Sequence, residues 1–254
     1  MDVTGPTLAQ RAVAVLRARQ YLVFYAIPIH ALATFAALAL SWLHEGGTVE
    51  EVLARARAPV YDAVAGPGVA SVTLGVAYLL LFTWFRAGLI RSIVGRLHFR
   101  PQDAAQFWRL LALHLAIELV SALGVAAVAI RDDAGVAAAA GIAVFAFTFV
   151  VMYADYAIVI TGLDAPRAVA RSWACVRANL PVSALVVLVV TLVSTAAAAA
   201  LAASVDGSLL QAAPLLVIAI VVMGLVTFVA DVVLIVTYVH AIENGVLPHA
   251  RRRA

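Results

Sequence analysis

Ionisable side chains stand inside long apolar stretches of this sequence, where they could take part in ion pairing, proton transfer or ligand binding. The six are His30, Arg86, His114, Glu118, Asp155 and Asp231. A charged side chain at the centre of a bilayer costs on the order of 2.5 to 3.5 kcal/mol on insertion scales, so we expect these side chains to face the protein interior and one another. Arg86 can pair with Asp155 or Asp231. The acid left over then takes a proton or a histidine, His114 or His30, as its partner.

The stretches that hold these residues are long enough to be membrane-spanning helices. The chain is 65% hydrophobic and 12% charged, with a mean hydropathy of +1.04. An apolar helix of about 20 residues crosses a hydrocarbon core roughly 30 Å thick. The predicted spans are 21–43, 69–94, 105–130, 139–162, 182–203 and 213–240. We therefore expect an all-α fold, a polytopic membrane bundle of six transmembrane helices that forms a single domain over residues 1–254.

The six ionisable residues lie at similar depths in the predicted spans. Counted from the arginine-rich side at 1.5 Å per residue, five of them fall about 10 to 14 Å inside and Glu118 falls about 20 Å inside. Glu118 follows His114 by one helical turn on the same face. This polar layer is predicted to be an ionic plug that fixes the register of the helices, a pathway for a solute or protons, or a site for a polar lipid headgroup.

Arginines mark one side of the predicted bundle. Three precede the first span, four stand in the second connection, three in the fourth, and three follow the last span. The opposite side carries Arg55, Arg57 and Arg131. By the positive-inside rule, both termini are predicted to face the cytoplasm. Because the arginines lie in short segments between apolar runs, and not on a folded basic surface, nucleic acid is excluded as a partner.

Three segments outside the spans are predicted to be short amphipathic helices on the membrane surface, at 7–19, 48–64 and 164–180. One face of the first carries Leu8, Ala12, Val15 and Leu16. In the second, Thr48 and Glu51 have the spacing of a capping box. In the third, Asp164 can cap the start of the helix. The apolar side of this third helix is predicted to carry Val169, Trp173, Val176 and Leu180.

Two parts of the chain repeat. The fourth and sixth spans end in similar sequences, ADYAIVIT from Ala154 and ADVVLIVT from Ala230. Two connections also share a spacing, Pro101, Ala104 and Trp108 in one and Pro166, Val169 and Trp173 in the other. These matches favour a chain built from parallel helical hairpins.

The local motifs of several common enzyme classes, HExxH, GxSxG, GxxxxGK[ST] and GxGxxG, are absent from the sequence. Cys175 is the only cysteine, which excludes an intrachain disulfide and a thiolate metal cluster. His30 and His114 could join a carboxylate in a two-histidine metal site, and less readily hold a haem, but shared depth alone supports these interpretations. We therefore expect no cofactor and no metal.

The stretch 155–201 carries a resemblance to a known family. An acid late in a span is followed by Gly162 and Asp164, by a short helix with Ser172 and Asn179 in the pattern Ser-x6-Asn, and by a long aliphatic span. This order resembles bacterial six-helix membrane proteins related to the membrane domain of glycerophosphodiester phosphodiesterases. The resemblance implies an all-helical inner-membrane protein of a family mostly without an assigned activity. The soluble phosphodiesterase domain does not occur in this sequence, so that activity is not expected.

Three functions are compatible with the polar layer. The leading hypothesis is a non-enzymatic protein of the bacterial inner membrane that binds or helps to move a membrane-associated molecule, or supports a partner. The second is a carrier or channel for a small polar solute, which needs a water-accessible path to Asp155 or Asp231. The third is a metal-dependent intramembrane enzyme. The expected partners are the lipid bilayer and a lipid, a small polar ligand or another membrane protein.

Overall fold

The computed structural model describes residues 7–32, 69–95, 101–131, 134–203 and 209–247, and this part of the chain is helical with short turns. Its helices are α1 (Leu8–Arg19), the 3-10 turn η1 (Gln20–Leu22), an unlabelled helix at 23–32, α4 (Val69–Val94), α5 (Pro101–Arg131), α6 (Ala134–Val151), α7 (Ala154–Thr161), α8 (Ala165–Ala178), α9 (Leu180–Ala203) and α10 (Leu209–Glu243). The predicted helix at 48–64 and the second half of the first span lie outside the described residues.

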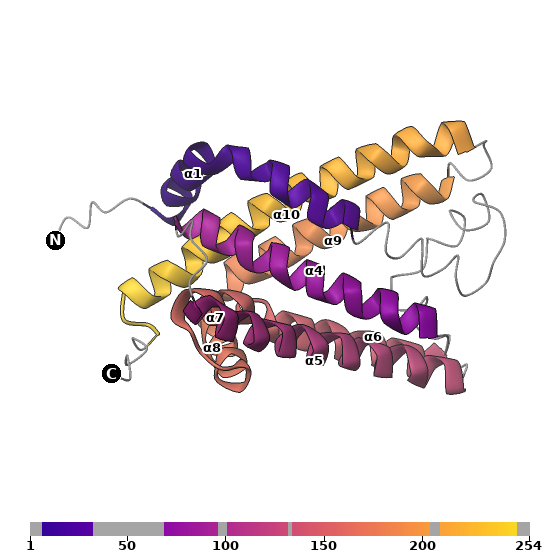
Figure 1. Cartoon of the computed structure of the whole chain (residues 1–254), viewed down its shortest axis with the longest axis horizontal. Coiled ribbons are helices and arrows are strands. Elements are labelled where there is room, and N and C mark those ends of the chain that lie inside the picture. The colour runs from indigo at the N-terminus through magenta and orange to yellow at the C-terminus, as the bar shows by residue number, and fades with distance from the viewer. Residues whose placement is uncertain (1–6, 33–68, 96–100, 132–133, 204–208, 248–254) are drawn as a thin grey trace.

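Among the described residues, six helical segments are long and apolar enough to cross a membrane, which confirms the predicted all-helical bundle of six spans. They are Leu8–Leu32, Gly75–Val94, Ala104–Gly124, Ala134–Thr161, Leu180–Ala197 and Pro214–Glu243. Figure 1 shows the long helices running side by side, with α1, α7 and α8 gathered at one end of the bundle. The helix α4 has the predicted bounds of the second span, and α5 extends the predicted third span at both ends.

Large apolar side chains cover the outer faces of the spans. Leu119, Leu123, Ile142, Leu185 and Leu192 are each more than half exposed. Scattered exposed leucines are common on soluble proteins, but so many on the long helices of one small chain need an apolar solvent. The acyl chains of a bilayer supply that solvent.

The helix α1 packs across the end of the bundle at which α10 finishes. Thr7 and Gln10 form a capping box at its start. Ala12 is buried, and Leu8, Val15 and Leu16 pack against the core, which confirms the predicted apolar face. Arg11 Nη1 lies 2.5 Å from Glu243 Oε2 at the end of α10. The first and last described helices therefore meet on the same side of the bundle.

A close helix contact positions the first span. A Cβ atom added to Gly224 of α10 would lie 2.8 Å from the Cα atom of Ile27. Small residues allow such close approach between helices in lipid. Since His30 follows Ile27 by one turn, and Asp231 follows Gly224 by two, this contact helps to place both side chains.

The fourth span contains a break that the sequence analysis did not predict. The helix α6 ends at Val151, Met152 and Tyr153 form a turn, and α7 begins at Ala154. Neither glycine nor proline stands at the break, so the usual sequence signals of a kink are missing. The cause is a side chain from another helix.

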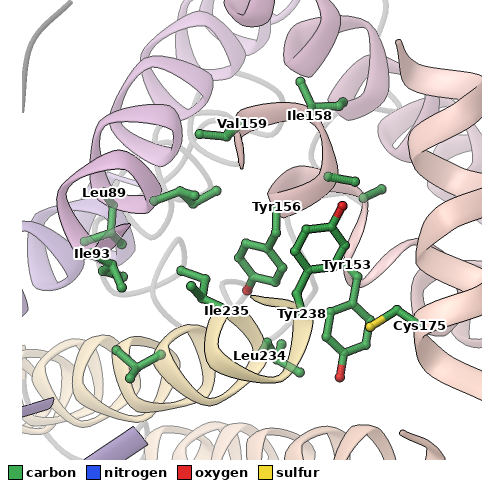
Figure 2. Packing of buried hydrophobic residues seen from close by; sticks show 14 of the residues in the cluster. Leu89, Ile93, Tyr153, Tyr156, Ile158, Val159, Cys175, Leu234, Ile235 and Tyr238 are labelled. Atoms are coloured by element: carbon green, nitrogen blue, oxygen red, sulfur yellow. The ribbon is translucent and has the colours of Figure 1, made fainter. Parts of the chain in front are cut away.

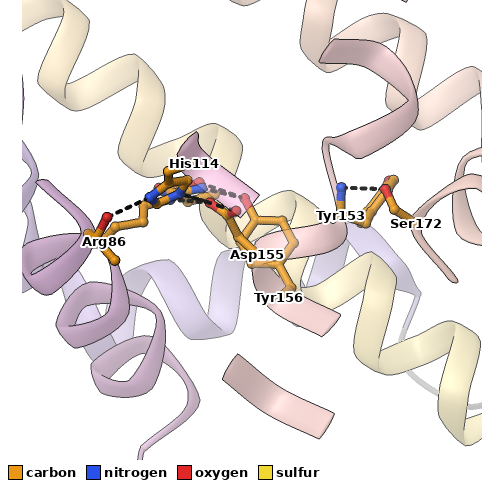
Figure 3. A network of polar contacts seen from close by, with 8 residues as sticks. Arg86, His114, Tyr153, Asp155, Tyr156 and Ser172 are labelled. Carbon is orange, nitrogen blue, oxygen red and sulfur yellow. Dashed lines mark hydrogen bonds and ion pairs between the residues drawn. The ribbon is translucent and has the colours of Figure 1, made fainter. Parts of the chain in front are cut away.

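Ser172 of α8 enters the backbone of the fourth span at this break. Its hydroxyl accepts a hydrogen bond from the Tyr153 N–H at 2.9 Å and donates one to the Val150 carbonyl at 2.6 Å. Ser172 is completely buried. The hydroxyl thus satisfies two backbone groups that a continuous helix would have paired internally. Figure 3 shows this contact beside the polar cluster described below.

The helix α8 begins as predicted, with the Asp164 carboxylate accepting from the Arg167 N–H at 3.1 Å. Its buried face differs from the predicted one by a small rotation and consists of Ala168, Ser172, Cys175 and Val176. Trp173, which was expected on the apolar side, is 41% exposed, and the Arg177 guanidinium lies 5.4 Å from its ring centroid. Small side chains on the buried face allow α8 to approach the broken span closely enough for Ser172 to reach it.

Buried tyrosines form the centre of the core where α7, α8 and α10 meet, as Figure 2 shows. Tyr153, Tyr156 and Tyr238 are completely buried. The ring of Tyr153 lies 6.3 Å from that of Tyr156 and 6.4 Å from that of Tyr238, between centroids. The Tyr153 hydroxyl is also paired with Ser183 Oγ at 3.0 Å. This rigid group holds α7, and with it Asp155, against the last span.

Candidate functional site

Arg86 of α4 joins three helices through an ionic cluster, shown in Figure 3. Its Nε donates to Asp155 Oδ2 of α7 at 3.0 Å, and its Nη1 donates to Asp231 Oδ2 of α10. The sequence analysis expected Arg86 to pair with one of these acids, and the structure pairs it with both. Asp231 is 3% exposed, so this ion pair is removed from solvent.

Tyr156 completes the cluster, although the sequence analysis did not include it. Its hydroxyl donates to Asp231 Oδ1 at 2.6 Å and accepts from Arg86 Nη2 at 3.2 Å. The Arg86 guanidinium carbon lies 5.6 Å from the centroid of the Tyr156 ring. In the sequence, only its position directly after Asp155 indicated that Tyr156 could belong to the cluster, since both residues lie in the first turn of the same short helix.

His114 of α5 is held between two partners. Its Nε2 lies 3.4 Å from Asp155 Oδ1, and its Nδ1 lies 2.8 Å from Thr83 Oγ1. If the Thr83 hydroxyl donates to Nδ1, Nε2 carries the ring proton and donates to Asp155. Thr83 is completely buried and was also not anticipated from the sequence. His114 therefore extends the ionic cluster to a fourth helix.

All six ionisable residues singled out in the sequence line one cavity of about 340 Å³. The remaining lining residues are mostly apolar or aromatic, namely Ala26, Ile29, Tyr78, Phe82, Leu89, Ile117 and Thr227. His30 enters from the first span, and Glu118 lies one turn beyond His114 on α5. The size and the mixed lining are typical of sites for small ligands.

Helical spacing explains why these residues share a cavity. Tyr78, Phe82 and Arg86 recur every fourth residue along α4, and His114, Ile117 and Glu118 recur at three and four on α5. Side chains at these intervals lie on one face of a helix. Each helix therefore presents a polar and an aromatic or aliphatic group to the same space.

The repeated sequence at the ends of the fourth and sixth spans has repeated local geometry. Asp155 and Asp231, the second residues of the two copies, both bind Arg86. Thr161 and Thr237, the last residues of the copies, each donate to the carbonyl four residues earlier, at 2.5 and 2.8 Å. The two copies thus approach one arginine in equivalent positions. The wider hairpin repeat stays a prediction.

The cavity has more acidic than permanently basic groups. Asp155, Asp231 and Glu118 are its carboxyl groups, and Arg86 is its one arginine. Within the described part of the chain, Glu118 has no hydrogen bond or ion pair, and it interacts with His114 only electrostatically. Three of the residues that line the cavity form ring contacts with one another. The ring centroids of Tyr78 and Phe82 are 5.7 Å apart, and those of Phe82 and His114 are 5.1 Å apart.

Metal binding has no geometric support in the described residues. No group of three or more His, Cys, Asp or Glu side chains there lies close enough to hold an ion. Of the residues suggested for a two-histidine site, His114 and Asp155 contact each other, and they already bind Thr83 and Arg86, respectively.

No protein family, curated protein or solved structure matches this chain. The resemblance to the membrane domain of glycerophosphodiester phosphodiesterases therefore stays a prediction. Two of the residues that carry the resemblance have clear structural roles here. Ser172 occupies the break in the fourth span, and Asn179 ends α8, where its side chain donates to the Cys175 carbonyl at 3.1 Å. The Asn179 carbonyl in turn accepts from Ser183 Oγ at the start of α9.

Proposed function

We propose that this chain is a bacterial inner-membrane protein that binds a small polar or membrane-associated molecule in the cavity around Arg86 and Glu118. The observation that carries the proposal is that all six ionisable residues singled out in the interior of the spans line one space of about 340 Å³. Polar groups inside a membrane are costly, and such groups around a cavity mark binding sites or pathways more often than unused space.

A purely structural plug explains part of the cluster but not all of it. Arg86, Asp155, Asp231, Tyr156 and His114 satisfy one another and would suffice to fix helix register. Glu118 adds a carboxyl group that bonds to no described residue and lines open space. A carboxyl group kept there costs stability without strengthening the plug, so it supports a role in binding.

The proposed orientation places both termini in the cytoplasm. The helix α1 and the end of α10 meet at one end of the bundle. Arg109 donates to the Gly162 carbonyl at the end of α7, and the Arg171 guanidinium of α8 lies 5.9 Å from the ring centroid of Tyr238 on α10. Arg91, in the last turn of α4, donates to Gln106 near the start of α5. The arginine distribution along the sequence then assigns this end to the cytoplasmic side.

The test is native mass spectrometry of the protein purified in a mild neutral detergent. Ile117→Phe should fill the cavity, because Ile117 lines it. Leu119→Phe on the same helix is the matched control, because Leu119 is 61% exposed on the outer face. We expect a retained small molecule or lipid on the wild type and on L119F, and its loss from I117F. An empty wild type, or equal retention by all three proteins, would contradict the proposal.

A solute carrier is the second candidate, favoured by the break in the fourth span. Discontinuous helices often form the binding sites of carriers, and Asp155 stands in the first turn after the break. A carrier needs water access to the cavity, so Thr227→Cys in a Cys175→Ala background should react with a membrane-impermeant thiol reagent. Leu225→Cys, at a lipid-facing position, is the control. Failure of Thr227→Cys to react from either side of the membrane would exclude a carrier.

A further inference from the structure

Building on the proposed binding function, we propose that the cavity recognises an organic cation, a protonated amine attached to a small apolar or aromatic body. Three features carry this assignment: the balance of charges around the cavity, the commitment of Arg86 to protein partners, and the aromatic wall beside Glu118.

The balance of charges favours a positive ligand. Three carboxyl groups face the cavity, and Arg86 neutralises one of them. The other titratable groups that line or adjoin it are His30, His114, Tyr78 and Tyr156, none of which carries an obligatory positive charge. Two further positive charges are needed for neutrality, and protons or a bound cation can supply them. An anionic ligand would instead increase the uncompensated charge in a low-dielectric space.

Arg86 has little left to offer a phosphate or carboxylate. Each of its three guanidinium nitrogens donates to a protein oxygen, on Asp155, Asp231 and Tyr156. An anion would have to replace a buried carboxylate, at the cost of leaving that carboxylate unpaired. Recognition of a lipid phosphate by this arginine is therefore disfavoured.

Glu118 and the aromatic residues complement an amine. Glu118 lies about 6 Å beyond His114 along α5, at four residues of 1.5 Å each. An ammonium group beside it would supply the hydrogen-bond donors that its carboxylate lacks among the described residues. Phe82 and Tyr78 extend along the facing helix, and aromatic faces attract cations. Ile29 and Ile117 offer apolar surface for the body of the ligand.

The experiment measures thermal unfolding of the detergent-purified full chain with three probes of matched shape: 2-phenylethylammonium, 3-phenylpropanoate and 2-phenylethanol. We expect the ammonium probe alone to raise the melting temperature in a saturable manner. Glu118→Gln should weaken its apparent affinity at least tenfold. Glu243→Gln is the matched control, because Glu243 is half exposed and pairs with Arg11 at the end of the bundle. That variant should bind the probe as the wild type does.

Glu118→Gln should fold, because Glu118 makes no hydrogen bond to the described residues. If it does not, Glu118→Asp serves instead, and we expect weakened but measurable binding because the charge is kept on a shorter side chain. Equal stabilisation by the propanoate or the alcohol, or unchanged amine binding by both Glu118 variants, would overturn the cation assignment.

The failure of this inference can be told apart from failure of the proposed function. Stabilisation by the propanoate or the alcohol that is lost in Ile117→Phe would preserve the binding cavity and reject the cation. No stabilisation by any probe, together with an empty protein in native mass spectrometry, would reject both.

Discussion

The hydroxyl of Ser172 replaces a helical hydrogen bond at Tyr153, two residues before Asp155. The short helix α7 can therefore begin after the break. Its first turn directs Asp155 towards Arg86, and Tyr156 towards Arg86 and Asp231. A surface helix thus sets the geometry of the interior cluster through one side chain. This contact links the connection between the fourth and fifth spans with the cavity.

Ser172→Ala is expected to destabilise the protein by about 1 to 3 kcal/mol, because it leaves the buried Tyr153 N–H and Val150 carbonyl without their partner. Chemical unfolding in mixed micelles measures this change. Ser194→Ala is the control, since Ser194 bonds only to a carbonyl of its own helix. We expect less than about 0.5 kcal/mol for the control. Equal effects of the two substitutions would show that Ser172 does not support the break.

Tyr156→Phe removes one donor to Asp231 and one acceptor from Arg86. Hydrogen bonds to charged groups contribute about 1.5 to 3 kcal/mol, so we expect a loss of unfolding free energy in this range. Tyr153→Phe offers a matched comparison, because that equally buried hydroxyl is paired with the neutral Ser183. Its cost should be about 0.5 to 1.5 kcal/mol. A larger loss for Tyr153→Phe would argue against an ionised cluster at Tyr156.

Gly224→Ala should separate the first and last spans, because the new Cβ would lie 2.8 Å from the backbone of Ile27. We expect a loss of about 1 to 3 kcal/mol from overpacking. Gly141→Ala has no atom within 4 Å of its new Cβ and should be neutral, or stabilising by up to about 1 kcal/mol through helix propensity. Thermal unfolding of the two variants under the same conditions compares them. A neutral Gly224→Ala would contradict the close contact.

Cys175 predicts a pH dependence of stability. Burial raises the pKa of its thiol from 9.0 to about 12. Above pH 9 the unfolded chain therefore loses this proton while the folded chain keeps it, so stability falls as the pH rises. Between pH 8 and pH 10 the wild type should lose on the order of 1 kcal/mol relative to Cys175→Ala. Parallel pH profiles of the two proteins would show that the thiol is not held neutral by burial.

The spans and the charged part of the site were predictable because water-to-lipid transfer imposes strong constraints. Apolar length alone located α4 at its observed bounds. The cost of an isolated charge in lipid predicted that Arg86 would pair with Asp155 or Asp231, and it pairs with both. These penalties are large enough to determine which helix faces turn inward.

The residues with neutral hydroxyl groups were not predicted, because their burial imposes no comparable penalty. Thr83, Tyr156 and Ser172 are cheap to bury when bonded, and such residues occur throughout the spans. The break at Met152 and Tyr153 depends on Ser172, which lies about 20 residues later in the chain. No local pattern marks a break whose cause is a tertiary contact.

The most direct test of the ionic cluster compares Arg86→Met with the triple variant Arg86→Met, Asp155→Asn, Asp231→Asn. If Arg86 forms ion pairs with both acids in the interior, Arg86→Met alone should lose about 3 to 5 kcal/mol of unfolding free energy, because it leaves two buried carboxylates without their positive partner. The triple variant should recover most of that loss. A triple variant no more stable than Arg86→Met, or an Arg86→Met protein as stable as the wild type, would contradict the cluster.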